Sequence, residues 1–394
     1  ILAKVKIVAK AHSHFIITLE ILQFEKDIES RHITRSLKGR AEELIGETNF
    51  AINQINEVTN LSNIALKLYG LFLENGPVKD EVQSREIERQ FKDNLFSIKE
   101  DQISFYGKAY LHQSYCWYYM ITLDTTRYYR HAEKWVDLFT KHPEAKKENP
   151  FLYLKAVHNL LNALFILGRH QKMNLEIENL EQFYAQSSTF NENLEKQTFV
   201  YLYTAKLNKH FLEGTFTEGL ELIKPIETKL GQYHQYIDIH RVLVFYYKIA
   251  SLYFGSGDNE QAIEYLNKII NLKVGHLRSD IQCFARLLHL IAHYELDNLQ
   301  LVEHLIKSVY RFLSKMESLD AVLTQIFEFL KKSLSSNPQD VKKSFVELRN
   351  KLEIISTSKY NRRSYQYLDI VSWLDSKIEN MAVEEVIRRK FMKG

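Results

Sequence analysis

A pair of glycines of the kind that can surround a phosphate occurs in the stretch GSGDNE at residues 255–260. A phosphate-binding loop needs a glycine-rich turn between a buried strand and a helix, and a lysine that reaches the phosphates. No strand pattern precedes this stretch, and no Gly-Lys-Ser or Gly-Lys-Thr sequence follows it. We therefore interpret GSGDNE as a turn between two helices, with Asp258 or Asn259 as the cap of the second helix.

Two groups of histidines have spacings that metal ligands can use. His289 and His293 are four residues apart, so they share one helix face, and Glu295 lies nearby. We interpret His293 as a packing residue that makes one hydrogen bond, because it occupies a position where an aromatic residue packs. The second group has too few side chains on one face for a tight site: His234, Asp238 and His240. We predict no metal and no cofactor.

The basic and aromatic stretch SKYNRRSYQY at 358–367 contains residue types that stack on bases and hold phosphates. It is short and isolated, so we interpret it as a solvated loop before the last helix and do not expect nucleic acid to bind. The 52 basic and 49 acidic residues nearly cancel, which gives no electrostatic reason to expect nucleic acid or an anionic membrane. No GxSxG, HExxH or kinase motif occurs. We therefore predict that the chain is not an enzyme.

The composition and the apolar periodicity indicate an all-α protein without a sheet. Only 13 Gly and 5 Pro occur among 394 residues, 45% hydrophobic content supplies a core, and apolar residues recur with a period near 3.6. Start and stop signals predict about 16 helices: 2–12, 15–31, 33–74, 79–97, 101–123, 125–141, 150–167, 170–184, 193–213, 216–230, 235–255, 259–272, 277–296, 298–315, 317–335 and 339–394, the last broken near 358. The helix at 33–74 is unusually long, and Gly46 offers an alternative break within it.

The cysteines and the lengths of the apolar runs indicate the cellular environment in which we expect the chain. Cys116 and Cys283 form no paired metal or redox motif, so we expect free thiols in a reducing, cytoplasmic environment. No run of 18 apolar residues is present, so we expect no membrane span. The chain begins at Ile1 rather than Met, so we expect that a targeting segment or a further domain could precede it.

The turns between paired helices resemble one another in sequence. They read LFILGRHQ, HFLEGTFT, YFGSGDNE and HYELDNLQ, and their equivalent points are Gly168, Gly214, Gly257 and Asp297, at spacings of 46, 43 and 40 residues. Glycine adopts a positive φ without steric cost, which lets one helix stop and the chain reverse. A helix-pair repeat of this length predicts a solenoid.

The unit around Gly257 carries a more specific pattern of large, small and aromatic positions: Tyr246, Ile249, Ala250, Tyr253, Gly257, Ala262, Leu266 and Ile269. In this pattern residues 243–276 resemble a tetratricopeptide repeat. Its neighbours are less regular, with Met173 and Gly219 at the small position of the second helix. A weaker unit spans 107–142, with Arg127 in the place of the glycine. The resemblance implies a right-handed superhelix of antiparallel helix pairs. It also implies three parts: N-terminal helices with half a repeat (1–100), a repeat array (101–315) and capping helices (316–394).

The resemblance implies that the first helix of each pair lines a concave binding face. Two sets of residues, three and six positions before each turn, share one face of these helices: Phe165, Phe211, Phe254 and Tyr294, and Asn162, Asn208, Ser251 and Ile291. We predict a ladder of aromatic and polar side chains that binds an extended or helical peptide, with Lys155 and Tyr247 as further contacts beside His158 and Tyr201. The alternative is that these rings pack between neighbouring repeats.

We therefore predict a non-enzymatic, cytoplasmic scaffold that recognises a protein or peptide through the concave face. Some members of the family clamp a carboxylate with lysines and asparagines. Asn162 and Asn208 are present here, but the matching lysines do not repeat, so we do not expect this subclass. The alternative is a peptide-sensing regulator, similar to some bacterial tetratricopeptide proteins, whose effector domain or partner lies outside this chain.

Overall fold

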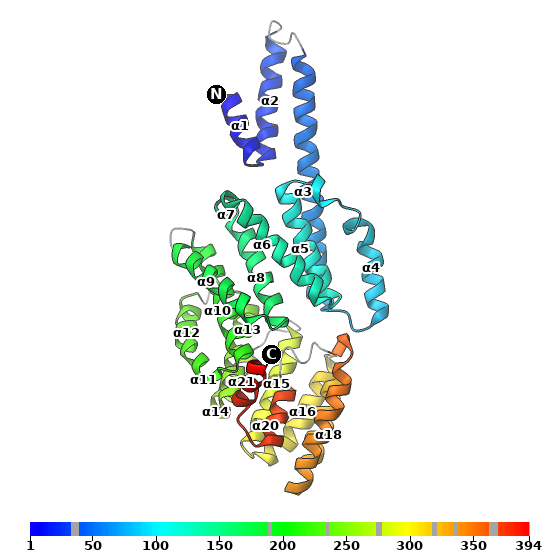
Figure 1. Ribbon diagram of the computed structural model, residues 1–394, viewed down its shortest axis with the longest axis vertical. Coiled ribbons are helices and arrows are strands. Elements are labelled where there is room, and N and C mark those ends of the chain that lie inside the picture. Colours follow the sequence, from blue (N-terminus) through cyan, green and yellow to red (C-terminus); the bar gives the residue numbers. More distant parts are fainter. Residues whose placement is uncertain are drawn as a thin grey trace. The chain divides into compact units, whose positions relative to one another are not determined.

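The computed structural model describes residues 1–32, 39–187, 191–233, 236–272, 278–316, 321–334, 337–361 and 369–393. Every regular element within these ranges is a helix, which confirms the all-α prediction (Figure 1). The chain forms two compact units, Ile1–Asn149 and Pro150–Gly394. The three-part division by repeat content stays a prediction, because compactness does not measure repeat content.

The first unit consists of α1 (Leu2–Ala11), α2 (Phe15–Arg31), α3 (Arg40–Asn75), α4 (Glu81–Leu95), η1 (Glu100–Gln102), α5 (Phe105–Ile121), α6 (Thr125–Lys141) and α7 (Pro143–Glu148). From Arg40 onward the predicted long helix is continuous across Gly46 (Figure 1); its predicted start at 33–38 lies outside the described residues. Its apolar stripe explains this continuity, because Leu44, Ala51 and Leu61 are all buried.

The turn between α5 and α6 corrects one predicted position. Leu123 has the positive φ of 61° and Asp124 caps α6 by accepting a hydrogen bond from the Arg127 N–H. Arg127 therefore lies inside the first turn of α6 and does not replace a turn glycine. The prediction failed because a leucine in the left-handed conformation carries no glycine signal.

A histidine pair lies between α5 and α6. The Nδ1 atoms of His112 and His131 are 3.2 Å apart, and His112 Nε2 lies 3.3 Å from a carboxylate oxygen of Glu100. The His131 ring stacks on Tyr115 at a centroid distance of 4.2 Å. Burial lowers the pKa of His112 to about 4 and that of His131 to about 3, so both rings are neutral near pH 7.

The second unit consists of helix pairs and a C-terminal segment: α8 (Pro150–Ile166), α9 (His170–Ser187), α10 (Glu192–Glu213), α11 (Phe216–Gly219), η2 (Leu220–Leu222), α12 (Ile223–Gln232), α13 (Ile239–Ser256), α14 (Asn259–Ile270), α15 (Ser279–Glu295), α16 (Leu299–Lys315), α17 (Ala321–Ser333), α18 (Pro338–Ser356), η3 (Lys359–Asn361), α20 (Ile370–Glu379) and α21 (Val383–Lys393). The first helices of successive pairs pack side by side, α8 on α10, α10 on α13 and α13 on α15.

The four predicted chain reversals are confirmed. Gly168, Gly214 and Gly257 have φ values of 65°, 65° and 91°, and Asp297 has 58°. At the third reversal the Asp258 side chain accepts a hydrogen bond of 3.1 Å from the Gln261 N–H, so Asp258 rather than Asn259 caps α14.

Two predicted helices are divided. The stretch 216–230 contains α11, η2 and α12, because Pro225 has no N–H with which to bond the carbonyl of Glu221. The stretch 339–394 ends its first helix at Ser356, close to the predicted break, but divides again at Asn380, where φ is 55°. Among the described helices, none is both long enough and apolar enough to span a bilayer.

Candidate functional site

Three first helices bring predicted residues together around a lysine that the sequence analysis did not select. Lys248 of α13 donates a hydrogen bond of 2.5 Å from Nζ to Asn208 Oδ1 of α10. The same Nζ lies 5.2 Å from the ring centroid of Phe211 and 5.9 Å from that of Phe165 of α8. Both distances fall within the range of cation–π attraction. We call Phe165, Asn208, Phe211 and Lys248 the Lys248 site.

The charge of Lys248 is poorly compensated. Lys248 is half-buried as a residue, and its Nζ bonds the neutral Asn208 amide, with no carboxylate among the described residues within ion-pair distance. Burial, together with the nearby positive charge of Arg278, lowers the pKa of Lys248 to about 8. The site therefore holds a desolvated cation for which an anionic group of a ligand would be a favourable partner.

A stacked pair of rings lies on the same helices as the Lys248 site. The rings of His158 (α8) and Tyr201 (α10) stack with centroids 4.0 Å apart, and Arg241 of α13 lies 5.1 Å from the Tyr201 centroid. Burial and the charges of Arg241 and Lys248 lower the pKa of His158 to about 3. His158 is therefore neutral near pH 7, and the positive charge of this face comes from Arg241 and Lys248.

Other predicted ladder residues have partners within the chain. Phe254 and Tyr247 are buried, and Ser251 donates to the Tyr247 carbonyl at 2.9 Å. The Phe211 ring lies 5.7 Å from Phe216, the first residue of α11. These contacts fit the alternative in which rings pack between repeats.

Tyr294, the fourth predicted rung, lies in a cluster of rings from three later helices: Phe329, Phe345 and Trp373. Asn162 is half-buried on α8 and Lys155 is exposed there. Whether any of the nine selected residues contacts a partner stays a prediction.

The predicted role of His293 is confirmed, since its Nδ1 lies 3.2 Å from Asn298 Nδ2 and its ring packs edge-on against His289 at 4.5 Å. Glu295 instead accepts a hydrogen bond of 2.8 Å from Trp373 Nε1. No three potential ligand side chains of the described ranges gather around a point that could hold a metal ion. His234 and residues 362–367 of the basic stretch lie outside the described residues.

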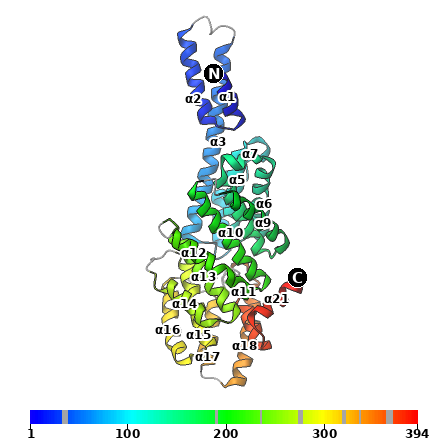
Figure 2. The same cartoon turned by 90° about the vertical axis from the view of Figure 1, so that its left-hand side faces the viewer.

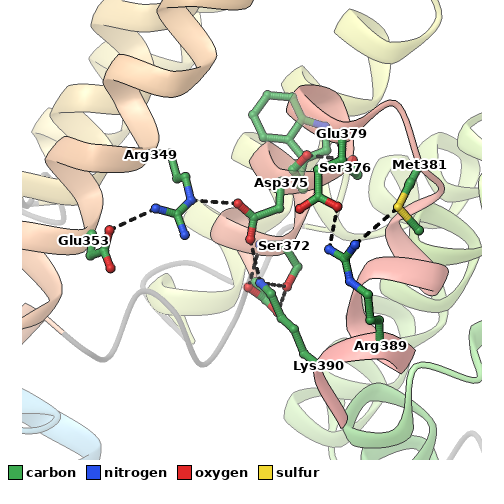
Figure 3. A network of polar contacts seen from close by, with 11 residues as sticks. Arg349, Glu353, Ser372, Asp375, Ser376, Glu379, Met381, Arg389 and Lys390 are labelled. Carbon is green, nitrogen blue, oxygen red and sulfur yellow. Dashed lines mark hydrogen bonds and ion pairs between the residues drawn. The ribbon is translucent and has the colours of Figure 1, made fainter. Parts of the chain in front are cut away.

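A polar network joins α18, α20 and α21 (Figure 3). Asp375 of α20 accepts a 2.8 Å hydrogen bond from Arg349 of α18, and its second oxygen lies 2.9 Å from Lys390 Nζ of α21. Burial alone would raise the pKa of Asp375, but the hydrogen bonds from Lys390 and Arg349 lower it below its ordinary value. Arg389 forms a further ion pair with Glu379 at 2.5 Å. The C-terminal segment is thus connected helix to helix by charged groups.

Comparison with known proteins agrees with the repeat pattern. A family model of the tetratricopeptide repeat matches residues 243–273, a stretch that contains most of α13 and all of α14, including Lys248. No curated protein matches the chain. A tetratricopeptide repeat indicates a scaffold for protein–protein interaction. With one matched repeat and a helical-repeat fold around it, the chain is a tetratricopeptide-repeat-like protein.

Proposed function

We propose that this chain is a non-enzymatic scaffold that binds a peptide segment of a protein partner on the face formed by α8, α10 and α13. The segment places a carboxylate against Lys248 and apolar atoms against Phe165 and Phe211. The observation that carries this proposal is the Lys248 site, where a half-buried cation lies between two rings without an acidic partner among the described residues.

The energetics of the site favour this chemistry. A hydrogen bond to a charged group contributes about 1.5–3 kcal/mol, and aromatic residues dominate the energy of most interfaces. Asn162, Ser251 and Lys155 flank the site along the first helices and supply further polar contacts to the segment. Phe254, Tyr247 and Tyr294 support the face from within, and Asn208 orients the ammonium group. The proposed compartment is the cytoplasm, and the proposed array is a right-handed superhelix.

Selection of peptides from a random library on the full chain tests the proposal. We expect the selected peptides to contain Asp, Glu or a free carboxyl terminus beside an apolar residue. Lys248→Met should weaken their binding by about tenfold or more, the equivalent of one charge-assisted hydrogen bond. Lys268→Met is the matched control, because Lys268 also lies over an aromatic ring, that of Tyr265, but belongs to α14, a second helix.

Two results would reject the proposed function. One is the selection of no peptide by the folded chain. The other is equal affinity of the selected peptides for the wild-type protein and the Lys248→Met variant.

A further inference from the structure

The second helix of the Gly214 repeat begins without a cap of its own. Thr215 precedes α11 and makes no side-chain capping hydrogen bond, whereas the equivalent residue of the next repeat, Asp258, caps α14. The missing acceptor comes from α21: the Glu384 carboxylate accepts hydrogen bonds from the Thr217 N–H at 3.2 Å and from the Thr217 hydroxyl at 2.5 Å. A residue near the C-terminal end thus completes this turn.

Gly214 allows α21 to approach the turn closely, so that Glu384 of α21 reaches Thr217 of α11 (Figure 2). A Cβ atom at position 214 would lie 2.4 Å from the Arg388 nitrogen and 2.9 Å from its Cα, both backbone atoms that cannot rotate away. Gly168 has the same φ of 65°, yet a Cβ there would meet only a leucine methyl group, at 3.9 Å. Glycine at 214 therefore serves two purposes, the chain reversal and the contact with α21.

The remaining contacts of α21 with the array are made to α10 and α13, to Glu218 and to the start of α9. Arg388 forms an ion pair with the exposed Glu218 at 3.1 Å, and the Phe391 ring lies 4.6 Å from that of His170. Among its described residues, only Val386 and Ile387 are buried. Exposed ion pairs add little stability, so these two aliphatic side chains are the main anchors of the helix.

The preceding helix is anchored much more firmly. Trp373 of α20 is completely buried, bonds Glu295 of α15 and lies among aromatic residues of α15, α17 and α18. Residues 380–382 alone separate the two helices, and Asn380 has the left-handed φ of 55°. Rotation about this linker would separate α21 from α11 while α20 stays in place. The same rotation would have to break or rearrange the bonds of Arg389 and Lys390 to α20 (Figure 3).

We propose that α21 is a displaceable occupant of a helix-docking site formed by His170, Gly214, Thr217 and Glu218, and that a partner helix of the same pattern binds there when α21 leaves. We call these four residues the α21 site. The pattern is a glutamate, two aliphatic residues two and three positions later, and an arginine at the fourth, which α21 realises as Glu384, Val386, Ile387 and Arg388. The glutamate caps α11, the aliphatic pair is buried, the arginine binds Glu218, and the backbone crosses Gly214. The α21 site shares no residue with the Lys248 site, although α21 packs against α10 and α13, which carry Asn208, Phe211 and Lys248. The inference does not depend on the proposed function.

Release of α21 can be measured in the full chain with a pair of glycine variants. Gly214→Ala and Gly168→Ala impose the same backbone strain, but only the first places a methyl group against α21. We expect trypsin to cleave Gly214→Ala after Arg388 and Arg389 at least tenfold faster than Gly168→Ala, with unchanged helicity by circular dichroism. Equal cleavage rates in the two variants would overturn the displacement of α21.

Binding in trans tests the α21 site itself. The Val386→Asp variant should release its own α21 and leave the four site residues intact. A fluorescent synthetic peptide of residues 380–394 should then bind this variant saturably, bind the wild-type chain at least tenfold more weakly, and fail to bind the Val386→Asp, Gly214→Ala double variant. A peptide that itself carries Val386→Asp is the negative control.

Three outcomes of this experiment would contradict the proposal. The first is no binding of the peptide although trypsin shows that α21 is released. The second is equal binding to the double variant. The third is global unfolding of the Val386→Asp chain, which would make α21 a part of the cooperative core.

Discussion

Glu384 and Thr217 are joined by two hydrogen bonds although 167 residues of chain separate them. One of these bonds pairs the Thr217 backbone N–H in the first turn of α11. In the next repeat, a backbone N–H in the first turn of α14 is paired by the side chain of Asp258, which directly precedes that helix. The relationship shows that the repeats of this array are not equivalent in how their second helices begin, and it leads to the first prediction.

Glu384→Ala should lower the free energy of unfolding by about 1 kcal/mol, the usual cost of losing an N-terminal cap. Glu385→Ala is the control, because Glu385 is exposed and lies in the same first turn of α21, where it has the same relation to the helix dipole. Urea unfolding gives the stability, and hydrogen exchange of the Thr217 amide reports the cap directly. An unchanged Thr217 exchange rate in Glu384→Ala would show that the cap contributes nothing.

A glycine inside α13 gives a prediction opposite to helix propensity. A Cβ atom at Gly255 would lie 2.2 Å from the Phe216 ring, so Gly255→Ala should destabilise the protein by about 1–3 kcal/mol through overpacking. Gly46→Ala is the control within α3, where no atom lies within 4 Å of the added methyl group. This variant should gain about 0.5–1 kcal/mol from better helix propensity. Chemical denaturation of both variants checks the opposite signs.

The histidine pair of the first unit predicts acid sensitivity. An unfolded histidine has a pKa near 6.5, whereas burial lowers the pKa of His112 to about 4 and that of His131 to about 3. Between these values the unfolded chain binds more protons, so stability should fall as the pH decreases from 6.5 to 4, by on the order of 2 kcal/mol. His131→Phe keeps a ring that can stack on Tyr115 but removes the titrating group, so the stability of this variant should change less between pH 6.5 and pH 4. Equal slopes for wild type and variant in urea unfolding across this range would refute the assignment.

Lys248 predicts a pH dependence of the same sign at alkaline pH. Its pKa of about 8 lies below the unfolded value near 10.4, so the unfolded state binds more protons between these two values. The Lys248 contribution to stability should therefore rise between pH 8 and pH 10, by on the order of 1 kcal/mol. Lys248→Met keeps the aliphatic chain and should abolish this rise. The difference in unfolding free energy between the two proteins at pH 7.5 and 9.5 is the measurement, and a constant difference would contradict the lowered pKa.

Local signals in the sequence were sufficient to predict the helices and most of their turns. Gly168, Gly214 and Gly257 mark reversals because positive φ favours glycine, and Asp258 is recognisable as a cap from its position after the turn. Leu123 escaped prediction because its left-handed conformation is imposed by its neighbours. The turn itself was predicted, between the helices at 101–123 and 125–141, but its positive-φ position was assigned to Arg127 instead of Leu123.

The candidate sites were less accessible to sequence reasoning. The pattern of rungs identified Phe165, Asn208 and Phe211, but Lys248 is a single lysine in an otherwise apolar helix. It lies three residues before Ser251, so extending the ladder by one more step would have found it. The α21 site depends on two segments that are remote in sequence, and no local pattern connects Thr217 with Glu384.

The remote cap of α11 also has a consequence for synthesis on the ribosome. Translation delivers α10 and α11 long before Glu384, whereas Asp258 and α14 are made almost together. The repeat around Gly214 therefore leaves the exit tunnel with an incomplete turn, and the turn stays incomplete until α21 has also left the tunnel. Nascent chains arrested before α21 should be cleaved by protease near 216–222, while those that include α21 should resist. The synthesis of α21 thus completes a turn that was made 167 residues earlier.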